Sequence, residues 1–162
     1  MALSRPKERI HPKALKVWRI NGVIKSVIEW LLVIGFFLMR YFLFENIPFF
    51  IGIILIVLAA VMTLMQIIVI PQIRMFYWGY QINEHDIDIQ HGIIVIKRTL
   101  VPMTRIQHVD TEHGPILRLF SLATLSISTA GTKHKIPALL QDKAEELRQQ
   151  ISLLAKVSED DV

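Results

Sequence analysis

The chain of 162 residues contains no cysteine. This absence excludes a disulfide-stabilised scaffold, a zinc or iron–sulfur site held by thiolates, and a cysteine nucleophile. Charged residues are also scarce, at 20% of the chain, whereas soluble domains usually carry about 25%. The scarcity is local, because residues 30–73 hold only two charged side chains, Arg40 and Glu45. With hydrophobic residues at 52%, the composition excludes a disordered protein and argues against a wholly soluble one.

The longest uncharged stretch runs for 28 residues, from Asn46 to Ile73. About 20 apolar helical residues, rising ~1.5 Å each, cross a hydrocarbon core of ~30 Å. We therefore predict a transmembrane helix at about 48–70, with its end at Pro71. A shorter apolar stretch precedes it and reaches the same length when extended over 24–43. We predict a first span there, so that residues 23–73 form a transmembrane hairpin.

Polar residues in the first span have two interpretations. Lys25 and Glu29 lie one helical turn apart near one end of the span, which favours an interfacial ion pair. An ionisable side chain inside a span can also be functional, so this alternative for Glu29 stays open. Small residues that would let the two spans pack closely occur at four positions: Gly35, Gly52, Ala59 and Thr63.

Positive charge is concentrated before the first span. Residues 1–22 form a basic flank, and residues 1–26 carry seven basic side chains against one acid, Glu8, whereas residues 71–162 carry ten basic and eleven acidic ones. The positive-inside rule then places both termini in the cytoplasm, with only the link near Glu45–Pro48 outside. A near-neutral remainder argues against a nucleic-acid partner. Four basic residues are expected at the membrane surface, where an anionic leaflet attracts each by about 1 kcal/mol: Lys13, Lys16, Arg19 and Lys25.

From residue 74 onward the hydrophobic period changes from helical to two. Alternating or β-branched stretches predict strands at 80–82, 86–90, 93–101, 105–112, 123–130 and 133–136. We place a turn at His91-Gly92, and we expect residues 123–130 to form a half-buried strand. After Pro137 an apolar stripe with helical spacing predicts a C-terminal helix: Leu140, Ala144, Leu147, Ile151 and Leu154. The α+β domain thus covers 74–155, followed by an acidic disordered tail at 156–162.

Three segments of this domain resemble the bacterial pleckstrin-homology (PH) domain family, and more narrowly its small two-span, YdbS-like membrane proteins. They are Val101–Val109, Gly114–Ala123 and Ser128–Gly131. The resemblance extends over roughly residues 20–155. One departure is Ser121, where the family usually has glycine at a tight turn.

The resemblance implies an antiparallel PH-like β-barrel of about seven strands, capped by the C-terminal helix, in a multi-pass protein of a bacterial cell membrane. It also implies a hetero-complex, because such proteins often occur beside a larger membrane protein with several PH-like domains. A homo-oligomer is the alternative. The family has no established catalytic activity, and the phosphoinositide ligands of eukaryotic PH domains do not transfer by fold alone.

The sharpest candidates for ligand or partner binding lie around the fourth predicted strand: Arg105, Gln107, His108 and Arg118. The guanidinium groups of Arg105 and Arg118 could hold an anionic lipid headgroup or an acidic partner surface through their planar fork of donors. The structural alternative is that Arg105 pairs with Asp110 or Glu112. Under that alternative, the Gly114-Pro115 dipeptide only shapes a turn.

Other chemistry finds little support. His108, Asp110 and Glu112 share one face of a strand, with His113 adjacent, but the spacing matches no established metal motif, so we predict no metal and no cofactor. The chain has no nucleophile elbow around its serines and no glycine-rich phosphate loop, so we predict no catalytic residue and no enzyme. We expect instead a membrane-anchored PH-like interaction module. The alternative is a protein that binds a lipid headgroup or a membrane-active compound, with a role in envelope stress tolerance.

Overall fold

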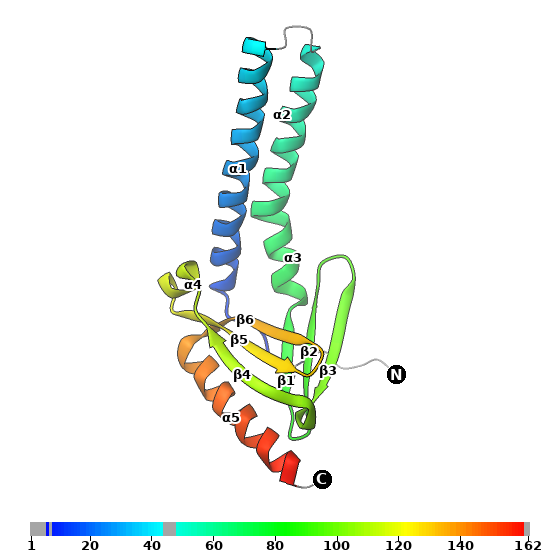
Figure 1. The fold of residues 1–162 in the computed structure, drawn as a ribbon, viewed down its shortest axis with the longest axis vertical. Coiled ribbons are helices and arrows are strands. Elements are labelled where there is room, and N and C mark those ends of the chain that lie inside the picture. Colours follow the sequence, from blue (N-terminus) through cyan, green and yellow to red (C-terminus); the bar gives the residue numbers. More distant parts are fainter. Residues whose placement is uncertain (1–5, 7, 44–47, 161–162) are drawn as a thin grey trace. The chain divides into compact units, whose positions relative to one another are not determined.

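A computed structural model describes residue 6, residues 8–43 and residues 48–160 (Figure 1). Most of the predicted link near Glu45–Pro48 therefore lies outside the described residues. The chain divides into two compact units, which are described separately below. Residues 18–73 form the helical unit, and residues 1–17 together with 74–162 form the sheet unit.

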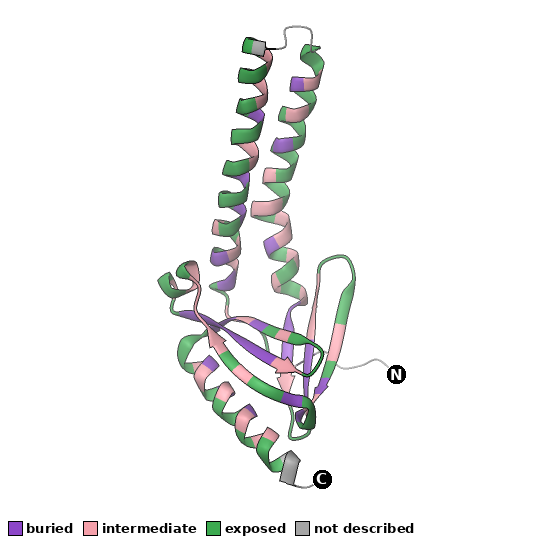
Figure 2. Cartoon of the chain, in the orientation of Figure 1, coloured by how far each residue is buried: buried purple, intermediate pink, exposed green. Residues whose placement is uncertain are grey.

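The helical unit consists of two long helical segments. The first is α1 (Ala14–Leu43), and the second is built from α2 (Phe49–Leu64), a π-helical segment η1 (Met65–Val69) and α3 (Ile70–Tyr77). Both contain a stretch of 29 residues that is apolar and long enough to cross a membrane. Their large apolar side chains are mostly exposed, as the green helices of Figure 2 show, so the core of a soluble protein does not account for them.

The second helical segment does not end at Pro71 as predicted. It continues to Tyr77 through α3, with Pro71 buried. A proline inside a helix lacks an amide donor, and its ring clashes with the carbonyl four residues earlier. The π-helical segment Met65–Val69 lies directly before this position. A π-bulge widens the helix there and accommodates the proline, so the helix continues.

The sheet unit contains two antiparallel sheets of three strands each. In the first, the order is β1 (Gly79–Ile82), β2 (Asp86–Gly92) and β3 (Ile96–Pro102). After a 3-10 turn at Met103–Arg105, the second has the order β4 (Ile106–Glu112), β5 (Leu122–Thr129) and β6 (Lys133–Leu140). A short helix α4 (Pro115–Leu119) joins β4 to β5, and α5 (Gln141–Asp160) follows β6. The α+β class is therefore present. Within the described residues neither sheet closes into the expected seven-stranded barrel.

The core of the sheet unit lies between the sheets and α5. Its largest fully buried side chains come from strands β2, β5 and β6, from the turn at Met103, from α5 and from Ile10 of the N-terminal segment. On α5 the predicted stripe is buried at Ala144, Leu147 and Ile151, whereas Leu140 belongs to β6 and is exposed. Helix α5 runs to Asp160, so residues 156–160 are helical rather than the disordered tail that we expected.

The segment before the first span is part of the sheet unit. The amide of Glu8 donates to the carbonyl of Tyr80 at 3.1 Å, and the Tyr80 amide donates back at 2.9 Å. The His11 amide donates to the carbonyl of Ala138 in β6 at 3.2 Å. Ile10 is 2% exposed. The N-terminal flank, expected only as a basic surface segment, thus connects β1 of one sheet to β6 of the other.

Three local predictions differ from the structure. The turn expected at His91-Gly92 begins two residues later, at 93–95, because β2 continues to Gly92. Strand β5 is buried on both faces rather than one, and even Ser126 is fully buried, because β5 is the central strand and also contacts α5. Strand β6 passes Pro137 and reaches Leu140, with a positive φ of 55° at Ala138.

The tight turn before β5 forms with serine in place of glycine. Ser121 adopts a left-handed backbone conformation, with φ of 56°, and its carbonyl accepts a hydrogen bond from the Gln141 amide at 3.1 Å. This conformation is the one in which glycine has no steric penalty. The departure from the family pattern therefore changes the residue but not the turn.

Candidate functional site

The residues predicted as a binding site do not form one cluster. Arg105 directly precedes β4 and Arg118 lies on α4, which follows it. The seven residues of β4, at ~3.3 Å each, separate the two by about 20 Å. Gln107 and His108 lie at the start of β4, where they line a small pocket of about 200 Å³ together with Lys156 of α5. Both arginines are exposed.

The ion pair that we considered for Arg105 is not formed. Glu112 instead pairs with two lysines of β6, Lys133 at 3.1 Å and Lys135 at 2.6 Å. These hydrogen bonds lower the pKa of the Glu112 carboxyl. Within the described residues, no three histidine, aspartate or glutamate side chains come together in a metal-binding arrangement.

The four predicted membrane-surface residues are all exposed. One directly precedes α1 and three lie in its first half: Lys13, Lys16, Arg19 and Lys25. The expected ion pair between Lys25 and Glu29 is not present. The Glu29 carboxylate accepts a hydrogen bond from the side-chain amide of Gln66 in the facing π-helical segment. One residue along, the Trp30 indole donates to the Thr63 hydroxyl at 3.1 Å. Two adjacent polar contacts therefore join the spans of the helical unit.

The two helices also approach each other closely at two glycines. A Cβ at Gly22 would lie 2.7 Å from the Gln66 carbonyl oxygen, and a Cβ at Gly52 would lie 2.5 Å from the Phe37 ring. Ala59 is buried as well. Of the small residues predicted to face the other span, Gly52, Ala59 and Thr63 do so, whereas Gly35 has nothing within 4 Å of its Cβ position.

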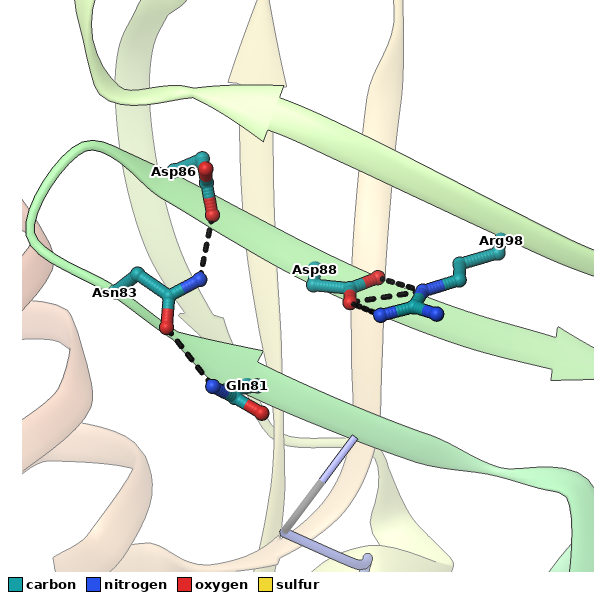
Figure 3. A network of polar contacts seen from close by, with 5 residues as sticks. All are labelled: Gln81, Asn83, Asp86, Asp88 and Arg98. Carbon is teal, nitrogen blue, oxygen red and sulfur yellow. Dashed lines mark hydrogen bonds and ion pairs between the residues drawn. The ribbon is translucent and has the colours of Figure 1, made fainter. Parts of the chain in front are cut away.

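In the sheet unit, the most buried charge is a carboxylate in β2 (Figure 3). Asp88 is only 4% exposed, and both of its oxygens accept hydrogen bonds from Arg98 Nε at 2.9 Å. The pair also includes Arg98 Nη2, and the carboxylate raises the pKa of Arg98. Such a bidentate pair satisfies a buried carboxylate and fixes the guanidinium, so we assign it a structural role.

A larger pocket of about 480 Å³ lies in the sheet unit beside the N-terminal segment. Its lining is mainly apolar, from Ile10, Met75 and Leu139, and its basic residues include Arg9 and Lys143. The Tyr80 hydroxyl in this lining forms a hydrogen bond with the Glu8 carboxylate. Burial raises the pKa of Tyr80, so the hydroxyl stays protonated.

The two sheets differ in how their outer edges are protected. Strand β4 carries a register irregularity between Ile106 and His108, and such bulges disfavour pairing with another strand. Strand β3 pairs with β2 in unbroken register over its whole length, and it has no strand partner on its other side within the described chain. Leu100, near the middle of β3, is 60% exposed.

Sequence reasoning missed these features for different reasons. Alternation predicted β3 but not that it lies at an edge, so Leu100 was not a candidate. Gln66 was hidden in an uncharged run, although an amide in a long apolar segment is itself a signal for an interhelical contact. Asp88 and Arg98 lie on neighbouring strands of a predicted hairpin, and opposite charges on adjacent strands are the signal that could have found their pair.

Comparisons with known proteins agree with this architecture. The family model described as "Bacterial PH domain" matches residues 27–155. The chain is 44% identical over 158 residues to UPF0699 transmembrane protein YdbS of Bacillus subtilis (strain 168), covering 98% of each chain. It is also 26% identical over 153 residues to UPF0699 transmembrane protein YdbT of the same organism, covering 92% of this chain and 30% of that longer protein. No solved structure shows a significant match. The chain therefore belongs to the bacterial PH domain family, as a membrane protein similar to the UPF0699 transmembrane proteins.

Proposed function

We propose that this protein is a non-enzymatic, membrane-anchored assembly module. Its two spans hold it in a bacterial cell membrane with both termini in the cytoplasm, as the basic flank before α1 favours. Its PH-like domain binds a larger membrane protein of the same family, or a second copy of this chain. Membership of a PH domain family supports a binding role rather than a catalytic one.

The open edge of β3 is the observation that carries the proposal. An unpaired edge presents a row of backbone donors and acceptors, and natural proteins usually protect such edges with bulges, charges or covering segments. Strand β3 has no bulge, carries one exposed lysine, Lys97, and exposes Leu100 next to its central residue, whereas β4 is bulged. Addition of a partner strand to β3 would satisfy these groups and cover Leu100.

The length of one relative supports the choice of partner. This chain matches 30% of the transmembrane protein YdbT, so most of that longer relative lies beyond the matched region. A domain fold shared between two membrane proteins favours pairing of similar domains at one membrane face. The expectation that the partner carries several PH-like domains rests on the family resemblance.

A second candidate is binding of a lipid headgroup or a membrane-active compound, with a role in envelope stress tolerance. The pocket beside the N-terminal segment favours it, because apolar walls and the basic side chains of Arg9 and Lys143 suit an anionic amphiphile. The expected binding residues Arg105 and Arg118 lie outside the lining of this pocket.

The test is affinity purification of the tagged full-length chain in mild detergent, followed by native mass spectrometry. We expect a protein partner to co-purify with the wild type and to be lost from Leu100→Lys. The matched control is Leu153→Lys on α5, because Leu153 is similarly exposed, at 66%, and should tolerate the change. Co-purified lipid without any protein partner would favour the second candidate, and equal loss in both variants would contradict a role for β3.

A further inference from the structure

The hairpin between β2 and β3 ends in four consecutive aliphatic residues, Ile93–Ile96, which we term the apolar tip. Ile94 is 94% exposed and Val95 is 79% exposed. Hairpin turns normally carry glycine, asparagine or aspartate, because these residues adopt turn conformations easily and are polar. Here the only residue of that kind is Gly92, where a Cβ would lie 2.2 Å from the Val95 carbonyl oxygen. The turn at 93–95 therefore exposes three β-branched side chains, which are more stable in an apolar environment than in water.

The register places the apolar tip at one defined end of the first sheet. Gly79, the first residue of β1, pairs with Gln90, and the hairpin continues beyond this point to the pair Gly92 and Ile96. Figure 1 shows the β2–β3 hairpin projecting past the start of β1. The strands are antiparallel, so the tip lies at the end where the chain enters β1 from residues 74–78.

Direct contacts show that the part of the hairpin next to the tip, around His91 and Lys97, lies against residues 74–78. We term this part the neck of the hairpin. The His91 ring stacks on Trp78, with ring centroids 5.6 Å apart and planes inclined by 24°. His91 also interacts electrostatically with Arg74, which lies in α3, the last part of the second helical segment. From Gln90 to Gly92 the paired strands extend by about 7 Å, at ~3.3 Å per residue, and the turn at 93–95 lies beyond them.

The charges around the neck are suited to an anionic surface. The side chains that act electrostatically on His91 are Lys97, Arg74 and His134, and none of them is acidic. Lys97 pairs with His91 across the hairpin, directly below the tip. Basic residues beneath an exposed apolar cluster are the pattern of segments that insert aliphatic side chains between lipids while their charges face the headgroups.

We propose that the apolar tip inserts into the acyl-chain region of the leaflet on the side of the PH-like domain. The occupant of this surface is therefore lipid, not a protein groove. Arg74, which interacts with His91, directly follows Ile73 of the helical unit in the chain, so the inserted tip is a second attachment of the sheet unit to the membrane. This proposal does not depend on a protein partner.

The absence of cysteine makes a site-specific test direct. The full-length chain is prepared as Ile94→Cys and, as a control on α5, Leu153→Cys. Each is labelled with an environment-sensitive fluorophore and reconstituted into vesicles of phosphatidylethanolamine and phosphatidylglycerol. We expect the label at position 94 to emit at shorter wavelength and to be quenched several-fold more strongly by lipids carrying a nitroxide on the acyl chain. Equal emission and equal quenching at the two positions would overturn the proposal.

A second variant separates insertion of the tip from an effect of the label. With the label at Val95→Cys, the additional change Ile94→Asp should sharply reduce acyl-chain quenching, because a carboxylate is costly among lipid tails. Unchanged quenching would overturn the proposal. Photo-crosslinking from position 94 to a protein in native membranes, without quenching in vesicles, would assign the tip to a protein partner and would also overturn it.

Discussion

Among single residues, Glu29 and Gln66 form the contact with the clearest energetic consequence in the helical unit. The carboxylate accepts a hydrogen bond from the amide, and its other oxygen is buried without a partner in the described structure. In an apolar environment a polar group that loses its partner cannot be compensated by water. The pair therefore determines which residues of the two helices face each other.

We predict that Gln66→Leu destabilises the full-length protein by about 1–2 kcal/mol, because it leaves Glu29 without a donor in the span. The double variant Glu29→Leu/Gln66→Leu should recover much of this loss, since both polar groups are then absent. The free energy of unfolding in mixed micelles, titrated with sodium dodecyl sulfate, measures both effects. A double variant less stable than Gln66→Leu alone would refute the contact, and Thr63→Val reports on the neighbouring Trp30 contact for comparison.

His91 makes the stability of the sheet unit sensitive to pH. Burial against Trp78, together with the positive charges of Lys97 and Arg74 and the electrostatic influence of His134, lowers the pKa of His91. The folded state therefore favours the neutral ring, and the stability that His91 contributes is present above the unfolded pKa of about 6.5 and is lost as the pH falls below it. We predict that His91→Phe, which keeps the stacking but cannot be protonated, gains thermal stability relative to the wild type as the pH falls from 7.5 to 5.5. A melting-temperature difference that stays constant over this range would contradict the assignment.

At the scale of elements, Gly22 is the glycine at which one span meets the backbone of the other. A methyl group at Gly22 would meet the backbone of Gln66, which cannot move without separating the helices. We predict that Gly22→Ala lowers the unfolding free energy by about 1–3 kcal/mol through overpacking. Gly35→Ala is the matched control, because Gly35 has no neighbour within 4 Å and should be neutral or slightly stabilising. Equal effects of the two changes would show that the helices do not pack through Gly22.

Local patterns predicted most elements but not how they meet. Hydrophobic length predicted both long apolar helices, and alternation or β-branched composition predicted all six strands within a few residues. The turn at 93–95 was misplaced because β-branched residues normally indicate a strand, and only tertiary position makes them useful at a turn. Pro71 was expected to end a helix because sequence does not reveal that a π-bulge precedes it.

At the scale of the whole molecule, the site was less predictable than the fold. Arg105 and Arg118 are thirteen positions apart, and only the extended strand β4 between them shows that they lie at opposite ends of a seven-residue strand. The edge of β3, the interhelical pair at Glu29 and the role of residues 8–11 all depend on pairings between distant segments. Such pairings carry no local signal in one sequence.

We propose that a membrane hairpin carries a PH-like domain whose open edge assembles with another chain. The most direct test is the native mass of the wild-type protein purified from its own membranes in mild detergent. We predict species heavier than the 18.7 kDa chain, either with a larger membrane protein of the family or as multiples of the chain itself. A protein recovered only as an 18.7 kDa monomer, even after crosslinking in intact membranes, would contradict the claim.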